Sequence, residues 1–83
     1  MQYSSEHSAR VRGPRRFDPK TMRSKRLSKS IRVIVGNLRR GNGSMVVQAY
    51  RFARAAFTPL QARKWLKDHR VEFVRFDAAR GRR

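Results

Sequence analysis

Most of the apolar residues of this chain lie after residue 30. Residues 30–40, SIRVIVGNLRR, are rich in β-branched side chains and predict a strand. Residues 45–57, MVVQAYRFARAAF, predict a second strand that frays near Ala55. Between them, residues 41–44 (GNGS) tolerate positive φ and favour a hairpin turn. We therefore expect the two strands to pair antiparallel.

The next stretch, FTPLQARKWLKDHR, predicts a helix. Thr58 is a good N-cap, Pro59 suits the first helical position, and Gln61 completes a capping box. At 100° per residue an apolar stripe faces the sheet and basic side chains occupy the opposite half. The stripe contains Ala62, Trp65, Leu66 and His69, and the basic half contains Arg63, Lys64, Lys67 and Arg70.

Residues 71–76, VEFVRF, predict a third strand, which gives the order β-β-α-β over residues 31–79 and a small α+β domain. Strand parity places Val71 and Phe73 on one face, and Val74 and Phe76 on the other. One helix covers only one face of a small sheet. We therefore expect the second apolar face to be covered by a homodimer through the sheet or by a larger assembly.

Residues 1–30 have a different composition, with nine basic residues against Glu6 and Asp18 and few large apolar side chains. Such a segment cannot bury enough surface to fold alone. It predicts a basic arm in front of the domain, either disordered or ordered on a partner, with Gly13 and Pro14 keeping RVRGPRRF extended. Residues 80–83, RGRR, form a basic C-terminal end.

The charge balance favours a polyanionic partner. The 83 residues include 22 Lys and Arg against 5 Asp and Glu, for a net charge of +17. Nucleic acid, DNA or RNA, is the commonest partner of such a chain, alone or within a larger ribonucleoprotein. No apolar run is long enough to span a bilayer and no secretory signal is visible, so we expect no membrane partner and a cytoplasmic protein, in the host cell if a virus encodes it.

The candidate nucleic-acid-binding residues form three groups of basic side chains with one aromatic. Tyr50 lies between arginines and could stack on an unpaired base, although a place in the core is the alternative. The arm supplies Arg10, Arg12, Arg15, Arg16, Arg23, Lys25 and Arg26; the hairpin supplies Arg39, Arg40, Tyr50, Arg51 and Arg54; the helix supplies Arg63, Lys64, Lys67 and Arg70.

Catalysis is not indicated. The acidic and histidine residues near the C-terminus do not form a metal site, because Asp68 falls on the solvated side of the helix and His69 on the packed stripe. Glu72 and Asp77 have opposite strand parity. The chain has no cysteine and no phosphate-binding glycine-rich loop. We expect no enzyme, no catalytic residue, no metal and no cofactor.

The helix-strand unit resembles a pattern found in small phage-encoded modules near head-protease and head-morphogenesis genes. There, T-x-x-[EQ]-A-x-x-W-L-K-x-H precedes a strand, and about 20 residues of this chain match it. The chain departs at Arg70, where that pattern has a glycine that ends the helix. The resemblance implies a phage or prophage setting. The matching positions are Thr58, Gln61, Ala62, Trp65, Leu66, Lys67 and His69.

Three functions share these electrostatics. The first is a non-enzymatic nucleic-acid-binding protein of a phage or mobile element that contacts backbone phosphates. The second is an anti-CRISPR-type inhibitor or accessory factor that binds a nuclease ribonucleoprotein. The third is a structural subunit of a ribosome-like nucleoprotein particle. They differ in partner, and the sequence leaves all three open.

Overall fold

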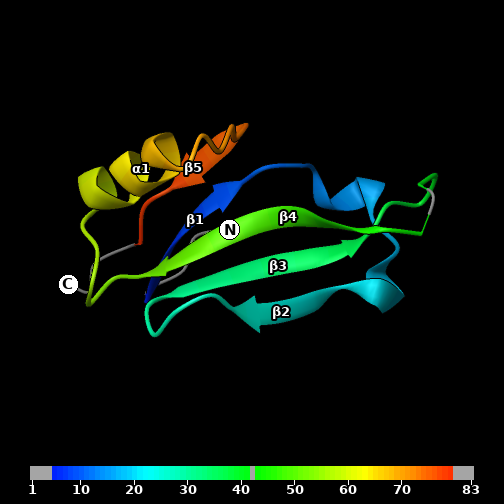
Figure 1. Ribbon diagram of the computed structural model, residues 1–83, viewed down its shortest axis with the longest axis horizontal. Helices are drawn as coiled ribbons and strands as arrows, with labels where there is room; N and C mark the ends of the chain where they lie inside the picture. Colours follow the sequence, from blue (N-terminus) through cyan, green and yellow to red (C-terminus); the bar gives the residue numbers. More distant parts are fainter. Residues whose placement is uncertain (1–4, 42, 80–83) are drawn as a thin grey trace.

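The computed structural model describes residues 5–41 and 43–79 as an antiparallel sheet with one α-helix packed on it, so the fold class is α+β as predicted (Figure 1). Two short 3-10 helices, η1 and η2, connect the first two strands. In chain order the elements are β1 (Glu6–Arg10), η1 (Pro14–Arg16), η2 (Pro19–Thr21), β2 (Arg23–Arg26), β3 (Ile31–Asn37), β4 (Met45–Ala53), α1 (Pro59–Asp68) and β5 (Arg75–Asp77).

The strand order across the sheet is β2-β3-β4-β1-β5, and every neighbouring pair is antiparallel. The predicted hairpin is confirmed: β3 and β4 pair from Ile31 opposite Phe52 to Asn37 opposite Met45. A bulge between Ile34 and Val35 shifts the register on the way. In the connection, Gly43 has a φ of 90°, a conformation that L side chains rarely adopt.

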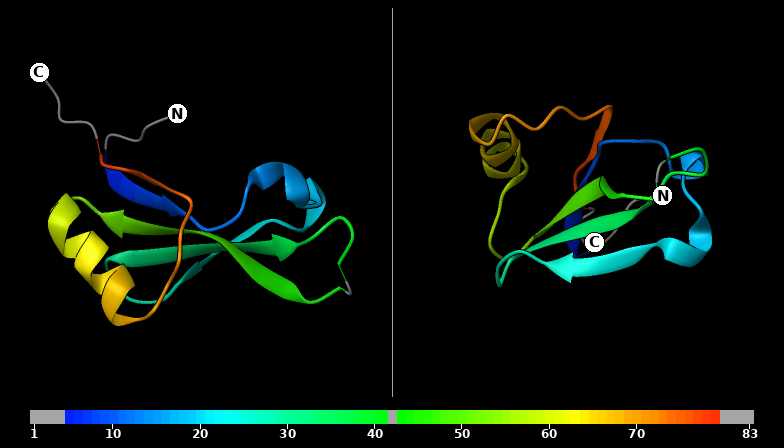
Figure 2. Two further views of the ribbon diagram at one scale, coloured as in Figure 1. Left: turned by 90° about the horizontal axis from the view of Figure 1, so that it is seen from above. Right: turned by 45° about the vertical axis from the view of Figure 1, so that its right-hand side comes forward.

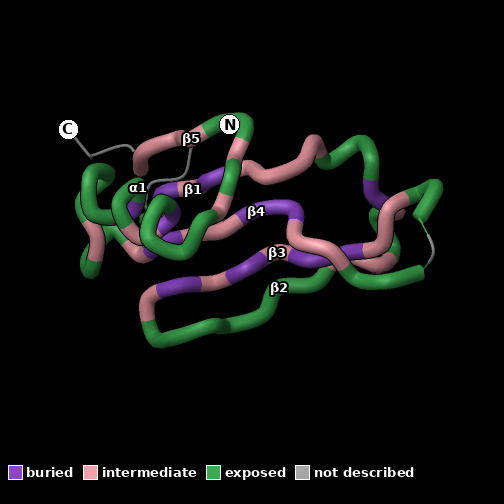
Figure 3. Tube along the Cα trace, turned by 45° about the horizontal axis from the view of Figure 1, so that its top comes forward, coloured by how far each residue is buried: buried purple, intermediate pink, exposed green. Residues whose placement is uncertain are grey.

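The prediction that the folded domain begins at residue 31 is wrong. β1 lies between β4 and β5 in the sheet, and β2 pairs with β3 along its edge. Ala9 and Phe17 are buried, so this part of the chain also contributes to the core. The cause is that backbone pairing does not need apolar side chains: all four residues of β2 are exposed, as Figure 3 shows. The ends of the predicted arm and tail, residues 1–4 and 80–83, lie outside the described residues.

The predicted third strand is shorter than expected. Only Arg75–Asp77 form β5, which pairs with β1 and not with the hairpin. Residues 71–74 instead cross from the end of α1 to the sheet edge (Figure 2). This crossing breaks the strand parity assumed from sequence. Phe76 lies on the same side as α1, where the Arg63 guanidinium stands 4.5 Å from its ring centroid.

The core lies between α1 and the sheet. Its fully enclosed members are small or aliphatic residues around one aromatic ring: Ala9, Ile31, Phe52, Ala62 and Leu66. Trp65 closes this cluster from the helix, with its ring 5.5 Å from that of Phe52 and 5.7 Å from that of Tyr50. Ala62, Trp65 and Leu66 of the predicted apolar stripe therefore pack on the sheet, whereas His69 is exposed.

The helix begins and ends with recognised capping motifs. The predicted capping box is present: Gln61 N–H donates to Thr58 Oγ1 at 3.1 Å, and Thr58 N–H donates to Gln61 Oε1 at 2.9 Å. At the other end, the N–H groups of Arg70 and Val71 donate to the carbonyls of Lys67 and Leu66. This is the pattern of a Schellman motif, and its left-handed residue is Arg70, with a φ of 57°.

Candidate nucleic-acid interface

The sheet has a helix face, against which α1 packs, and an opposite face, here called the open face. Within residues 5–41 and 43–79, only the segment with η1 and η2 passes over the open face, at its hairpin end, where Met22 and Phe17 approach Gly36. Because Ala9, Val33, Phe52 and Phe76 point to the helix face, the alternate residues point the other way.

Each strand places one arginine on the open face. Register follows from the pairings: Arg26 lies opposite Arg32, Arg32 opposite Arg51, and Arg10 opposite Arg75. The first three form a row across β2, β3 and β4. Like charges directly opposite each other destabilise a sheet, so this row needs compensation.

Glu6 provides that compensation. Its carboxylate accepts two hydrogen bonds from Arg32, at 2.8 Å from Nε and 2.7 Å from Nη2, and lies 3.8 Å from Nη1 of Arg51. Arg32 also donates to Ser24 Oγ at 3.0 Å. The hydrogen bonds from Arg32 are the main reason that the pKa of Glu6 is lowered, with the nearby charges of Arg51 and Arg26 adding to the effect against a desolvation that raises it.

A second carboxylate lies at the other edge of the open face. Arg75 Nε donates to Oδ1 of Asp77, two residues further along β5, at 3.1 Å. Five arginines and two carboxylates, Glu6 and Asp77, therefore leave the open face with three net positive charges. Small residues such as Ser8 and Ala49 lie opposite the arginines, so little side-chain volume surrounds the guanidinium groups there.

The hairpin end carries a cluster of four arginines that the sequence assigned to two separate groups. Arg15 and Arg16 of η1 meet Arg39 and Arg40, which follow β3, around a hollow of about 320 Å³ that Leu38 also lines. Backbone and side-chain bonds hold them together: Arg39 N–H donates to the Arg16 carbonyl at 2.7 Å, and Arg39 Nε donates to the Arg15 carbonyl at 3.0 Å. Figure 1 shows η1 and the hairpin side by side at this end.

The basic residues of α1 are more engaged than the sequence suggested. Lys64 Nζ lies 3.1 Å from Asp68 Oδ2. Arg63 packs over Phe76, so it does not project freely from the helix. Lys67 is exposed, and Arg70 lies at the turn after the helix.

The remaining predicted residues are dispersed. Arg23 and Lys25 are exposed on edge strand β2 and, by register with Val35 and Val33, point to the helix-face side. Arg12 donates to the Val47 carbonyl at 2.8 Å. Arg54 follows β4 at an exposed position, and its N–H donates to the Ser5 carbonyl.

Tyr50 takes the packed place that the sequence left as its alternative, whereas His69 lies at the end of the helix and not in the packed stripe. Tyr50 is half-buried on the helix face, with its ring 5.7 Å from Trp65. His69 is the C-cap residue of α1, and its ring stacks on Trp65 at 3.9 Å. His69 is nevertheless exposed and not enclosed in the core.

Sequence reasoning missed three members of the open face: Arg32, Arg75 and Glu6. The signal for Arg32 was present, because it lies between Ile31 and Val33, which point to the helix face. Glu6 had no such signal, since its role depends on the pairing of β1 with β4, which places Glu6 opposite Ala53, 47 positions further along the chain.

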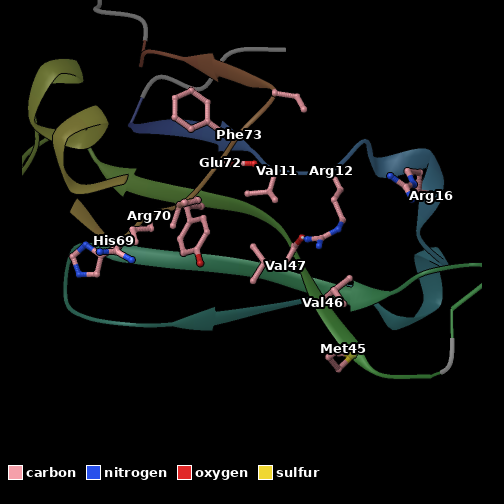
Figure 4. A pocket seen from close by; sticks show the side chains of 13 residues that line it. Val11, Arg12, Arg16, Met45, Val46, Val47, His69, Arg70, Glu72 and Phe73 are labelled. Carbon is pink, nitrogen blue, oxygen red and sulfur yellow. The ribbon is translucent and has the colours of Figure 1, made fainter. Parts of the chain in front are cut away.

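A groove lies on the helix face beyond the end of α1. Its volume is about 940 Å³, and residues of β4, of the segment after β1 and of the crossing 71–74 line it (Figure 4). Val47, Tyr50 and Phe73 supply apolar or aromatic surface, and Arg12 and Arg70 supply charge.

The described residues hold no group of three or more His, Cys, Asp or Glu side chains that could bind a metal ion. No helix in the described part of the chain is long and apolar enough to cross a membrane. Comparison with protein-family models, with curated proteins and with solved structures finds no match. The resemblance to phage head-morphogenesis modules therefore stays a prediction.

Proposed function

We propose that the protein is a non-enzymatic nucleic-acid-binding protein that contacts backbone phosphates through its open face and hairpin end. The observation that carries the proposal is the set of five arginines, one from each strand, on a sheet face that α1 leaves uncovered. The cytoplasm of the cell, or of the host cell, is the compartment where we propose it acts.

The spacing of the arginine row suits a densely charged polymer. Neighbouring strands lie about 4.8 Å apart, so Arg26, Arg32 and Arg51 present a charge at each step across the sheet. Duplex DNA carries one negative charge per roughly 1.7 Å of its axis, and arginine donates to phosphate through two parallel N–H groups. Because Arg32 already donates two N–H groups to Glu6, the exposed Arg26 beside it is the member of the row best placed to hold a phosphate.

The hairpin end extends this surface. Arg15, Arg16, Arg39 and Arg40 add four positive charges, and none of them has an ion pair with a carboxylate among the described residues. Clustering them raises the free energy of the unbound protein by repulsion, and a bound polyanion removes that repulsion. Phosphate contacts fix position and not sequence, so the proposal implies little sequence preference.

The test compares two pairs of substitutions that remove equal charge. Arg10→Gln with Arg26→Gln changes the open face, and Lys64→Gln with Lys67→Gln changes the outer side of α1. Binding to a duplex and to a single strand is measured by fluorescence anisotropy over a range of salt concentrations. We expect the open-face pair to reduce the salt slope of log K by about 1.8 for duplex, or about 1.4 for single strand, since each lost contact removes about 0.9 or 0.7.

The helix pair is expected to change the slope by less than half as much, because Lys64 already pairs with Asp68. Equal slopes for the two pairs would assign the binding to overall charge and not to the open face. Absence of measurable binding to any nucleic acid by the wild-type protein would reject the proposed function itself.

A further inference from the structure

The groove beyond α1 combines an apolar floor with a basic rim. Val11, Val47 and Tyr50 line it, and Phe73 borders it while its ring packs 6.1 Å from that of Phe76. In Figure 4 the labelled side chains extend from His69 and Arg70 at the helix end to Arg16 of η1. Its volume of about 940 Å³ lies within the range of roughly 300–1,000 Å³ usual for ligand sites.

The charges around the groove are mostly positive. Arg12, Arg16 and Arg70 line it, against one carboxylate, Glu72. The Arg12 guanidinium is fixed at the edge of β4 by its 2.8 Å bond to the Val47 carbonyl. An occupant that satisfies both parts of the groove carries flat apolar groups and regularly spaced negative charges.

Arg70 is a second, independent observation. It adopts a φ of 57° at the position after the helix where glycine is strongly favoured, and a non-glycine residue there is strained. A cation near a helix C-terminus interacts favourably with the helix dipole, and Lys67 in the last turn makes the same kind of interaction. Strained residues of this kind concentrate at binding sites, and this one lines the groove.

We propose that the groove binds unpaired bases of a single-stranded nucleic acid, with the bases against Tyr50 and the apolar floor and the phosphates at the arginines. This proposal rests on the proposed function and deepens it. It assigns unpaired bases to the groove on the helix face, and phosphate contacts of single strands and duplexes to the open face. A duplex keeps its bases stacked inside and cannot use an apolar floor, whereas single strands stack on aromatic side chains with little sequence preference.

One exposed valine and one exposed leucine give a test with a matched control. Val74 lines the groove and is 73 % exposed, while Leu60 lies at the start of α1, away from the groove, and is 77 % exposed. Val74→Glu and Leu60→Glu therefore make the same chemical change with little loss of burial. Affinity is measured for a 12-nucleotide oligo(dT) and for a 12-base-pair duplex.

We expect Val74→Glu to weaken oligo(dT) binding about tenfold, near the lower end of what one lost stacked base costs, and duplex binding less than about twofold. Leu60→Glu should weaken both ligands equally and by no more than about twofold. An equal loss for oligo(dT) and duplex in Val74→Glu would show a general charge effect and overturn the groove assignment.

Arg70→Gly separates affinity from folding. Glycine removes the strain, so the melting temperature should rise, while oligo(dT) affinity should fall about threefold to tenfold for a lost phosphate contact in the groove. Lys67→Gln removes one positive charge from the last turn of α1, outside the groove, and should leave the preference for oligo(dT) over duplex unchanged.

The two proposals fail in different ways. If the open-face pair weakens binding and both Val74→Glu and Arg70→Gly behave like their controls, the groove assignment fails and the proposed function stands. If the wild-type protein binds neither oligonucleotide, both fail.

Discussion

The two faces of the sheet come from the same strands but carry opposite kinds of side chain. On the helix face, Phe52 is fully buried between Ile31 and Trp65. On the open face, the neighbouring Arg51 and Arg32 lie beside the carboxylate of Glu6. Alternation along β3 and β4 is all that separates the two environments.

The difference shows how this small protein divides stability from charge. Burial on the helix face favours folding, whereas the arginine row opposes it and is tolerated because Glu6 offsets part of the repulsion. Proteins commonly retain such locally unfavourable groups where they bind something. The comparison predicts that truncating core side chains under the helix lowers stability, and that removing arginines from the open face weakens binding.

The largest effect is expected for Leu66→Ala. Leu66 is the fully buried residue by which α1 packs on the sheet. Its truncation leaves a cavity and should lower the free energy of unfolding by about 2–5 kcal/mol. Urea denaturation followed by circular dichroism measures it. Leu60→Ala, at a position 77 % exposed on the same helix, is the control and should change stability by less than about 0.5 kcal/mol. Similar losses in both variants would mean that α1 does not pack as described.

An intermediate effect is expected for Glu6→Gln. It removes the charge that accepts two bonds from Arg32, so the free energy of unfolding at pH 7 should fall by about 1.5–3 kcal/mol. Nucleic-acid affinity should rise, because the open face loses a negative charge. A variant whose affinity falls together with its stability would contradict the view that Glu6 limits the positive charge of the open face.

The pH dependence gives the same substitution a second readout. The folded pKa of Glu6 lies below its unfolded value, so its contribution is complete above the unfolded pKa, about 4.3, and is lost as the pH falls through the folded pKa. The stability difference between wild type and Glu6→Gln should therefore shrink as the pH is lowered below about 4. A difference that stays constant down to pH 2 would show that the charge of Glu6 contributes nothing.

The smallest effect is expected for Lys64→Gln combined with Lys67→Gln. Both residues are exposed on α1, and the 3.1 Å pair of Lys64 with Asp68 is an i,i+4 surface pair worth about 0.3–0.5 kcal/mol. The free energy of unfolding should change by no more than this, as measured by urea denaturation. A loss above about 1 kcal/mol would place these lysines in the packing of the helix face.

The parts of the fold that the sequence predicted correctly depend on local rules. Thr58 and Gln61 cap α1 through groups three residues apart, and the β3–β4 hairpin closes across a short turn that contains Gly43. Both signals lie within a few residues and need no knowledge of the rest of the chain. The helix stripe with Trp65 and Leu66 belongs to the same class.

The parts that were missed depend on pairing between distant segments. β1 has only one small apolar residue, Ala9, and β2 has none, so neither has the composition of a strand. Their places in the sheet come from backbone bonds to β4, β5 and β3. The open face was incompletely predicted for the same reason. Arg51 was a candidate from composition, but its neighbour Glu6 comes from a segment assigned to the arm.

The position of β1 also sets the order in which the protein can fold. β1 pairs with β5, with Ser8 opposite Asp77, and buried His7 bonds to the Phe57 carbonyl at 2.7 Å and to Ala79 N–H at 2.8 Å. During synthesis, β1 emerges before the other described elements but gains its last partners only when nearly all of the described chain is available. The β3–β4 hairpin closes a short loop and can form early, whereas β1 must close loops of about forty residues to β4 and about seventy to β5, which is entropically slow. We therefore expect the hairpin to be the nucleus, and the insertion of β1 between β4 and β5 to be the late step that completes the sheet.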